Sequence, residues 1–322
     1  MSDTRRPVVG LVAVIAAAAL FGLNGTVSKL ALSTGLTAER LVQIRAAGAA
    51  TCLLVAASMT RPHSLRAGPR EAAFLVGAGV VGIALVQWLY FIAIDRLPVG
   101  VALLLEFQAP VLIALYVWIV RREPVRSRLW AALACSVVGL IVIAKIWQGL
   151  RFDGLGVVAA LLSAVALAVY YLTGERGLTR RDPLSLAAWT FSASAVFWAA
   201  ILPWWTFPFG SLTESARVGK LGAVTGLTVP VWALVGYVVV LGTVVPYTLV
   251  LVGIRHLGPA RTSLAGMTEP VLAGLMAWLV LGERLTVVQL IGAGVVLAGI
   301  ALAETARVSA GSPDEQVVLP TS

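Results

Sequence analysis

The stretch VALLLEFQAPVLIAL, residues 101–115, places a carboxylate, an amide and a proline inside an otherwise apolar run. Glu106 lies about eight residues from the start of the helix that this run predicts, which is roughly 12 Å along the axis. An acid deep in a membrane costs about 2.5–3.5 kcal/mol, so a lipid-facing side chain is disfavoured there. We therefore expect Glu106 to face a cavity.

Pro110 follows Glu106 by four residues. A proline has no amide hydrogen, so the carbonyl of Glu106 loses its usual helical partner, and the helix is expected to kink beside the carboxylate. An acid next to a free carbonyl suits an ammonium group or a proton. The alternative role for Glu106 is structural, as an acid that is hydrogen-bonded to neighbouring helices.

A second acid, Glu269, directly precedes Pro270. When the sequence is shifted by 160 residues, Pro110 aligns with Pro270, whereas Glu106 aligns with Gly266. The two acids would then lie at different helical angles and make the cavity asymmetric if both faced inward. For Glu269, ligand binding and a structural role are equally open.

Two long cations, Lys29 and Arg45, lie near the ends of the first two predicted helices. Such side chains often extend to the membrane interface, but either one could turn inward to pair with Glu106 or to bind a substrate carboxylate. The other candidates are polar side chains, which line cavities or join helices to one another. They are Asn24, Gln87, Tyr90, Gln108, Tyr170, Tyr171, Tyr237 and Tyr247.

Other chemistry has little support in the sequence. Cys52 and Cys135 lie in separate apolar runs, and His63 and His256 lie in basic loops, so we expect neither a disulfide framework nor a metal site. GAGVVG at 77–82 fits GxGxxG but lies inside an apolar run with no strand before it, which favours close helix packing over a dinucleotide cofactor. An intramembrane enzyme is a weaker alternative, because no nucleophile and base occur together.

The elements that must position these residues follow from composition. Hydrophobic residues make up 59% of the chain and charged residues 12%, which is far from the composition of soluble domains. Apolar runs of about 20 residues recur, long enough to cross a hydrocarbon core of about 30 Å as helices. We predict an all-α polytopic membrane protein with ten transmembrane helices near 8–32, 40–60, 72–94, 98–120, 129–148, 154–173, 184–205, 230–254, 260–281 and 286–304.

The N-terminus imitates a secretory signal, but its apolar run continues to residue 32, which predicts an uncleaved first helix. More of the Lys and Arg residues fall in loops on the same side of the membrane as the N-terminus than on the other side. Because Lys and Arg collect in cytoplasmic loops, we expect both termini in the cytoplasm. Residues 1–7 would be a cytoplasmic N-terminus and 305–322 a disordered cytoplasmic tail. The net charge of +9 belongs to these loop clusters and does not indicate nucleic-acid binding.

The shift of 160 residues also aligns Trp118 with Trp278 and Gly139 with Gly299. We infer a duplication in which residues 8–148 and 154–304 are two five-helix repeats. Because five is odd, the second copy would enter the membrane from the opposite side. Inverted repeats of this kind are typical of alternating-access transporters, whose substrates bind near the midplane between the halves.

FGLNGTVSK at 21–29, Arg45, the two proline helices and GERLT at 282–286 occur in the order found in the drug/metabolite transporter superfamily, EamA family. The chain resembles that family over residues 8–304. YFIAIDRLPVGVALLLEFQAP is most similar to the threonine and homoserine exporter branch. The resemblance implies ten helices in two halves and export of small amino acids or related metabolites. The sequence departs from the branch at Ala109, where a glycine is common, and in having FG rather than WG in the first helix.

The resulting hypothesis is a secondary exporter in a bacterial inner membrane, with a small-molecule substrate bound between the halves. Glu106 would hold a cation or a coupling proton. The alternative is efflux of lipophilic or quaternary cations, for which membrane-embedded acids and aromatic rings are equally suited.

Overall fold

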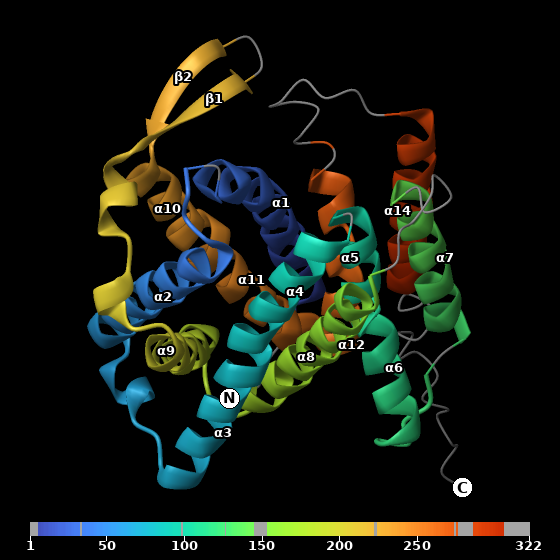
Figure 1. The fold of residues 1–322 in the computed structure, drawn as a ribbon. Coiled ribbons are helices and arrows are strands. Elements are labelled where there is room, and N and C mark those ends of the chain that lie inside the picture. The colour runs from blue at the N-terminus through green and yellow to red at the C-terminus, as the bar shows by residue number, and fades with distance from the viewer. Residues whose placement is uncertain are drawn as a thin grey trace, which may run out of the picture.

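The computed structural model describes residues 6–32, 34–97, 99–125, 127–144, 153–221, 224–273, 275 and 286–305. Its helices and strands are α1 (Pro7–Leu32), α2 (Ala38–Thr60), α3 (Pro69–Gly79), α4 (Val86–Arg96), α5 (Val99–Glu106), α6 (Ala109–Ile119), α7 (Ser127–Ala144), α8 (Gly154–Leu178), α9 (Pro183–Ile201), β1 (Ser215–Leu221), β2 (Val224–Pro230), α10 (Val231–Val239), α11 (Val245–Leu257), α12 (Pro259–Gly266) and α14 (Val287–Thr305) (Figure 1).

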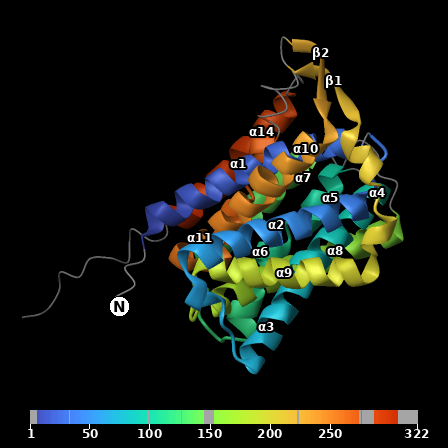
Figure 2. The ribbon, with the colours of Figure 1, turned by 90° about the vertical axis from the view of Figure 1, so that its left-hand side faces the viewer.

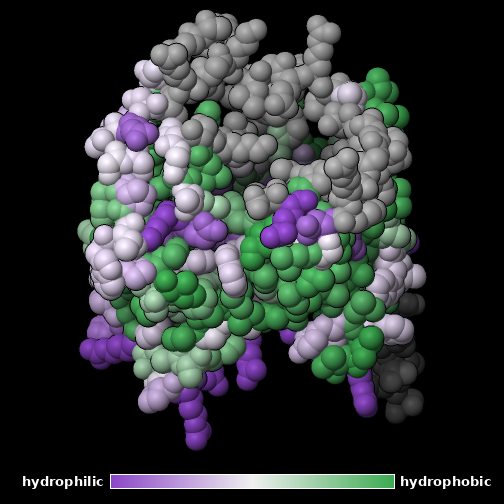
Figure 3. Space-filling view, viewed as in Figure 1, coloured by the Kyte–Doolittle hydropathy of each residue, from purple (hydrophilic) through white to green (hydrophobic). Residues whose placement is uncertain are grey.

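Most of these helices are apolar enough to lie in a membrane. In the described part of the chain, seven helical stretches have the length and composition to cross one: 7–32, 38–60, 69–93, 102–119, 154–178, 183–201 and 231–257. Ser127–Val142 and Leu290–Leu302 are shorter apolar helices. Hydrophobic residues cover much of the described surface in Figure 3, and hydrophilic side chains project from its lower edge. The prediction of a helical, polytopic membrane protein is confirmed.

Several predicted boundaries differ from the structure. α9 ends at Ile201 rather than at residue 205, because Pro203 cannot continue the helical hydrogen bonds. A small antiparallel hairpin then follows, with Ser215 paired to Pro230 and Leu221 to Val224, so the fold is not purely helical. Of the tail predicted at 305–322, only Thr305 is described. Of the helix predicted at 260–281, residues 260–273 and 275 are described, and the others lie outside the described residues.

Two helices are broken at equivalent places. α5 ends at Glu106, and α6 begins after a two-residue turn; α12 ends at Gly266, and residues 269–273 resume a helix after a turn of the same length. In each case a proline, Pro110 or Pro270, lies four residues after the end of the first segment, so its ring clashes with that carbonyl and supplies no amide. The predicted kink beside Glu106 is confirmed.

Two other helices each contain one π-helical turn. Val80–Leu85 lies between α3 and α4, and Val240–Val244 lies between α10 and α11. Such turns widen the helix locally and occur frequently at functional sites. Each turn contains a glycine, Gly82 or Gly242, that packs directly on another helix. The two glycines are 160 positions apart, as are the two prolines of the helix breaks.

Close contacts made by glycines show that helix pairs recur at fixed spacings. α1 packs along α11, and α8 packs along α4; Figure 2 shows α1 and α11 side by side. A spacing of 160 relates α4 to α11, and a spacing of 146 relates α1 to α8. Gly10 contacts Leu257, and the equivalent residues Gly156 and Leu97 contact each other. In the same way, Gly242 contacts Asn24, and the equivalent residues Gly82 and Tyr170 contact each other.

The pair α7 and α14 crosses at a matched point. A Cβ added to Gly139 would lie 2.7 Å from the carbonyl oxygen of Gly292, and one added to Gly299 would lie 2.8 Å from that of Ala132. Both the glycines and their contacts differ by 160 positions. Only a residue without a side chain allows the two backbones to approach this closely.

Arginines bond the loops at both ends of α9 to neighbouring segments. Near the start of α2, Arg40 Nη1 donates to the carbonyl oxygen of Pro203 at 3.2 Å. Before the start of α9, Arg181 Nη2 donates to the carbonyl oxygen of Arg66 at 2.8 Å, and Arg181 Nε donates to Glu71 at 2.7 Å. The first bond holds α2, which carries the predicted cation Arg45, against the loop after α9, and the other two hold the loop before α9 against the start of α3 and the segment that precedes it.

Candidate functional site

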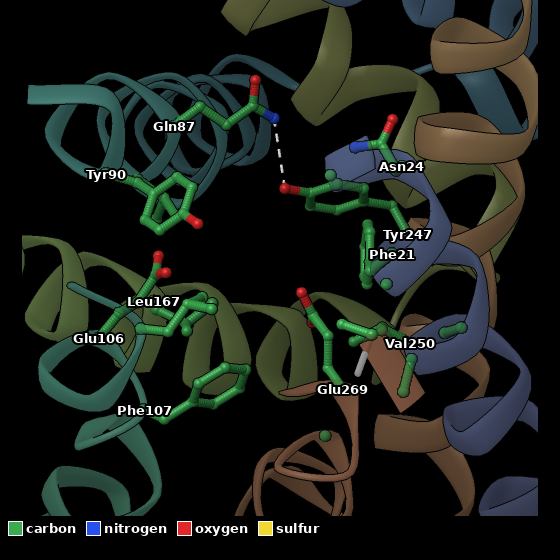
Figure 4. Close-up of a pocket in the computed structure, with 18 of the residues that line it drawn as sticks. Phe21, Asn24, Gln87, Tyr90, Glu106, Phe107, Leu167, Tyr247, Val250 and Glu269 are labelled. Atoms are coloured by element: carbon green, nitrogen blue, oxygen red, sulfur yellow. Dashed lines mark hydrogen bonds between the residues drawn. The ribbon is translucent and has the colours of Figure 1, made fainter. Parts of the chain in front are cut away.

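A cavity of about 340 Å³ lies at the centre of the bundle. Its walls come from α1, α2, α4, α5, α8, α11, the end of α12 and the helical turn at 269–273, so residues from both ends of the sequence meet there (Figure 4). The volume is in the range of pockets that bind small molecules. The polar lining residues are Asn24, Ser28, Arg45, Gln87, Tyr90, Glu106, Tyr170, Tyr171, Tyr247 and Glu269.

Glu106 faces this cavity from the end of α5. The residue is only 9% exposed, and Ser163 of α8 lies 2.8 Å from its Oε1. Within the described part of the chain, Glu106 takes part in no ion pair. A buried carboxylate without a cationic partner carries a large desolvation cost, which a bound cation or a proton would relieve.

The hydroxyl of Ser163 has two acceptors within reach. Its oxygen lies 2.8 Å from Glu106 Oε1 and 3.1 Å from the carbonyl oxygen of Val86, at the start of α4. A hydroxyl carries one proton, so it can donate fully to only one of them. If Glu106 is ionised, Ser163 donates to it; if Glu106 is protonated, the acid can donate to Ser163, which then donates to Val86. The protonation state of Glu106 is thereby linked to α4.

Glu269 reaches the same cavity from the helical turn that follows the second break. In Figure 4 its carboxylate points into the space between the α1 and α4 sides of the cavity, and Glu106 enters that space from another wall. No hydrogen bond or ion pair joins Glu269 to the described residues. The structure therefore brings the two predicted acids together, although they come from opposite sides of their turns.

Aromatic rings pack around Tyr247 at the wall of the cavity. Its ring packs edge-on against Phe21, Tyr170 and Phe191, with centroid distances of 5.2, 5.8 and 5.1 Å. Gln87 Nε2 donates to the Tyr247 hydroxyl oxygen at 3.2 Å, which is the bond drawn in Figure 4. Gln87 and Tyr247 occupy equivalent places, 160 positions apart, so this bond joins matching points of α4 and α11.

Of the two predicted cations, Arg45 has a described side chain and Lys29 does not. Arg45 points inward and is 8% exposed, so its guanidinium lines the cavity rather than extending to the membrane interface. Asn24, also 8% exposed, lies on α1 beside the π-helical turn that contacts Arg45. The side chain of Lys29 lies outside the described residues.

Two predicted candidates do not join this group. Gln108 is a predicted cavity residue, but it is not among those that line the cavity, and its amide donates to the carbonyl oxygen of Leu104 in α5 at 3.0 Å. Tyr237 lies on α10 and packs with the hydrophobic cluster around Leu36 and Phe207 instead.

Sequence reasoning missed Ser163, Thr243 and the cavity-facing Phe21. Small hydroxyl residues are common in membrane helices, where they usually bond to their own backbone. The available signal for Ser163 was its position in LLSAVALAVYY, where it is the only hydroxyl before the tyrosines. Among the described residues, no group of three His, Cys, Asp or Glu side chains is placed to hold a metal ion.

Comparison with known proteins gives a consistent result. Residues 8–145 and 154–305 each match the sequence profile described as the EamA-like transporter family. The chain is 29% identical to the threonine/homoserine exporter RhtA of Escherichia coli over 268 residues, covering 82% of this chain and 79% of RhtA. It is 24% identical to the uncharacterized inner membrane transporter YicL of Salmonella typhimurium, covering 94% of this chain and 96% of YicL.

A solved crystal structure shares the fold. It is 20% identical in sequence, has a TM-score of 0.72, and the match covers 95% of this chain and 100% of the other. At this identity the likeness concerns the arrangement of the helices alone.

Proposed function

This chain belongs to the EamA-like transporter family, and from that premise we propose that it is a secondary exporter of small amino acids or related metabolites. It is a multi-pass membrane transporter, as its apolar helices and its relatives indicate. The threonine/homoserine export named for RhtA supports small amino acids as the substrate class. The absence of a GKS or GKT phosphate loop from the sequence supports secondary rather than ATP-driven transport.

The proposed mechanism is alternating access between two inverted five-helix repeats, 8–148 and 154–304. The recurrence of the helix breaks, the π-helical turns and the glycine contacts at fixed spacings supports this arrangement. An odd number of helices in each repeat would orient the copies oppositely and leave a binding site between them. Both termini would then face the cytoplasm of a bacterial cell whose inner membrane holds the protein, in keeping with the distribution of Lys and Arg.

The observation that carries the proposal is Glu106, a buried acid with no cationic partner among the described residues, at the wall of a central cavity. A substrate ammonium group or a coupling proton would balance its charge. Exchange between the two would couple export to the proton gradient, because only one of them satisfies Glu106 at a time. Glu269 would contribute a second negative charge to the same space.

The test uses purified protein in proteoliposomes with radiolabelled amino acids. Glu106→Gln and Glu106→Ala are expected to lower the transport rate at least about 30-fold, as expected when one partner of a buried charged contact is removed. Glu123→Gln is the matched control, since Glu123 is exposed beyond the end of α6. Wild-type rates with an unchanged pH profile in both Glu106 variants would refute the role of Glu106.

Efflux of lipophilic or quaternary cations is the second candidate. The rings of Phe21, Tyr90 and Tyr247 together with the two acids favour it, because aromatic faces and carboxylates both bind such cations. Competition in the same proteoliposomes separates the two functions. An amino-acid exporter transports the labelled amino acid and is inhibited by unlabelled amino acids but not by tetraphenylphosphonium, whereas a cation exporter transports labelled tetraphenylphosphonium and amino acids do not compete with it.

A further inference from the structure

Arg45 is a buried cation that lines the same cavity as Glu269 but forms no ion pair with a described residue. Four ion pairs join described residues, and Arg45 takes part in none of them. The one described hydrogen bond of its side chain runs from Nε to the neutral hydroxyl oxygen of Thr243 at 2.6 Å. A guanidinium has five N–H donors, so the two terminal nitrogens keep their donors for another partner.

The hydroxyl of Thr243 is oriented to hold this arginine. Thr243 is fully buried in the π-helical turn Val240–Val244, and its Oγ1 donates to the carbonyl oxygen of Val238 at 2.7 Å. Its single proton is therefore used, and a lone pair on the oxygen faces Arg45. The π-helical turn thus fixes the guanidinium at its Nε end.

The surroundings hold the guanidinium at the cavity wall. The ring of Tyr247 lies 5.9 Å from the central carbon of the guanidinium, within the distance for a cation–π contact. On α1, Asn24 packs against Gly242 of the same π-helical turn, and its Oδ1 is 3.5 Å from the hydroxyl of Ser28. The amide nitrogen of Asn24, which lines the same cavity as Arg45, is then left as a second donor.

A planar anion fits this site. A carboxylate accepts two parallel hydrogen bonds from the terminal nitrogens of a guanidinium, which gives both energy and orientation. A lipophilic or quaternary cation would instead be repelled by the arginine. The acids Glu106 and Glu269 line the same cavity, so opposite charges are available to one small ligand.

We propose that Arg45, held by Thr243, binds the carboxylate of the substrate, while the ammonium group of the same molecule meets the acidic part of the cavity. This inference rests on the proposed function and narrows its substrate class to zwitterionic amino acids. Arg45 is then the residue that rejects lipophilic cations and decarboxylated amines.

The experiment compares each amino acid with its amide, which keeps the ammonium group and removes the negative charge. Ligand-induced rises in unfolding temperature are measured against concentration for the purified protein, with the twenty common amino acids and the amide of each one that binds. The variants are Arg45→Gln and Arg45→Lys. Arg70→Gln is the matched control, because Arg70 is exposed at the start of α3, outside the cavity.

Wild type and Arg70→Gln are expected to bind the acid at least about 30-fold more tightly than the amide. Arg45→Gln should bind both with similar, weak affinity, and Arg45→Lys should recover part of the preference, because it keeps the charge and loses the planar fork. If Arg45→Gln does not fold, the comparison of acid and amide on the wild type still decides whether a carboxylate is recognised.

Two other results have distinct meanings. Arg45 does not bind the carboxylate if the preference for the acid survives in Arg45→Gln, or if wild type binds acid and amide equally. In either case amino acids still bind, and the proposed export of amino acids stands. If wild type binds tetraphenylphosphonium and none of the amino acids, the inference and the proposed substrate class both fail.

Discussion

The break after Glu106 and the break after Gly266 differ in which side of the turn carries the acid. In the first, the acid is the last residue of α5, and Ala109 opens the next helix. In the second, glycine ends α12, and Glu269 opens the helical turn that follows. The prolines and the two-residue turns are the same, so the backbone of the break recurs while its charge has moved.

The helix residues that correspond at the two breaks also differ in polarity. Ser163 of α8 contacts Glu106, and the spacing of 146 that relates α8 to α1 makes Ala17 the counterpart of Ser163. Ala17 and Gly266 both line the cavity and have no polar side chain to offer. The devices that bend and pack helices therefore occur twice, and the acid–hydroxyl pair occurs once. An asymmetric ligand, such as a zwitterion, is the kind that such a cavity distinguishes.

The largest expected effect concerns the shared architecture. Gly139→Ala and Gly299→Ala should each lower the free energy of unfolding by about 1–3 kcal/mol, because the new Cβ meets the backbone of the partner helix within 3 Å. The two losses should be alike if the crossing is symmetric. Gly294→Ala on α14 is the control, since its Cβ would meet nothing within 4 Å. Thermal unfolding of the detergent-solubilised protein measures both losses of stability. Unequal losses would show that the crossing of α7 and α14 is not symmetric.

The next prediction concerns the acid that is unique to the second break. Glu269→Gln should lower the transport rate about tenfold, which corresponds to about 1.4 kcal/mol, and should leave the unfolding temperature unchanged. The physical reason is that Glu269 faces the cavity without a hydrogen bond or ion pair to the described residues. Transport in proteoliposomes is measured beside Glu214→Gln, an exposed acid outside the cavity. A loss of stability without a loss of transport would make Glu269 structural.

The sequence predicted the shared backbone features better than the directions of side chains. Pro110 and Pro270 break their helices through local chemistry, so a shift of 160 residues found both. Gln108 was predicted to line the cavity, but its amide bonds instead to the carbonyl oxygen of Leu104 across the break. Arg45 was left open between the membrane interface and the cavity, since the choice depends on a hydroxyl in a π-helical turn of another helix. Contacts between distant segments decide such cases, and spacing along one helix does not encode them.

A smaller effect is expected from the hydroxyl that occurs beside only one break. Ser163→Ala should lower transport a few-fold, since a neutral hydrogen bond contributes about 1 kcal/mol. It should also change the pH profile of transport, because Ser163 is the described hydrogen-bond partner of the Glu106 carboxylate. Arg45, Tyr90, Tyr171, Tyr247 and Glu269 also face this space and remain unchanged in the variant.

Ser194→Ala controls for the loss of a buried hydroxyl, because Ser194 of α9 is fully buried and its Oγ has no hydrogen-bond partner. Ser163→Thr retains the hydroxyl and should restore the wild-type pH profile if the larger side chain is accommodated. An unchanged profile in Ser163→Ala, at a rate close to wild type, would mean that Glu106 acts without this residue.

The smallest difference is between the starts of α1 and α8, the two helices that the spacing of 146 relates. α1 follows Arg6, whereas α8 follows Asp153, whose carboxylate accepts a hydrogen bond from the amide of Gly156 at 2.8 Å. That bond holds the pKa of Asp153 below its ordinary value of 3.8, with a further contribution from Arg96. A lowered pKa in the folded state means that the stabilisation is present above the unfolded value and is lost as pH falls through the folded one.

Asp153→Ala should therefore lower the unfolding temperature slightly at pH 7, and the gap to wild type should close as the pH is taken below 3.8. Asp153→Asn keeps an oxygen at the cap without the charge, so it should retain part of the stabilisation with little dependence on pH in this range. A gap for Asp153→Ala that persists undiminished at low pH would show that the carboxylate charge does not contribute.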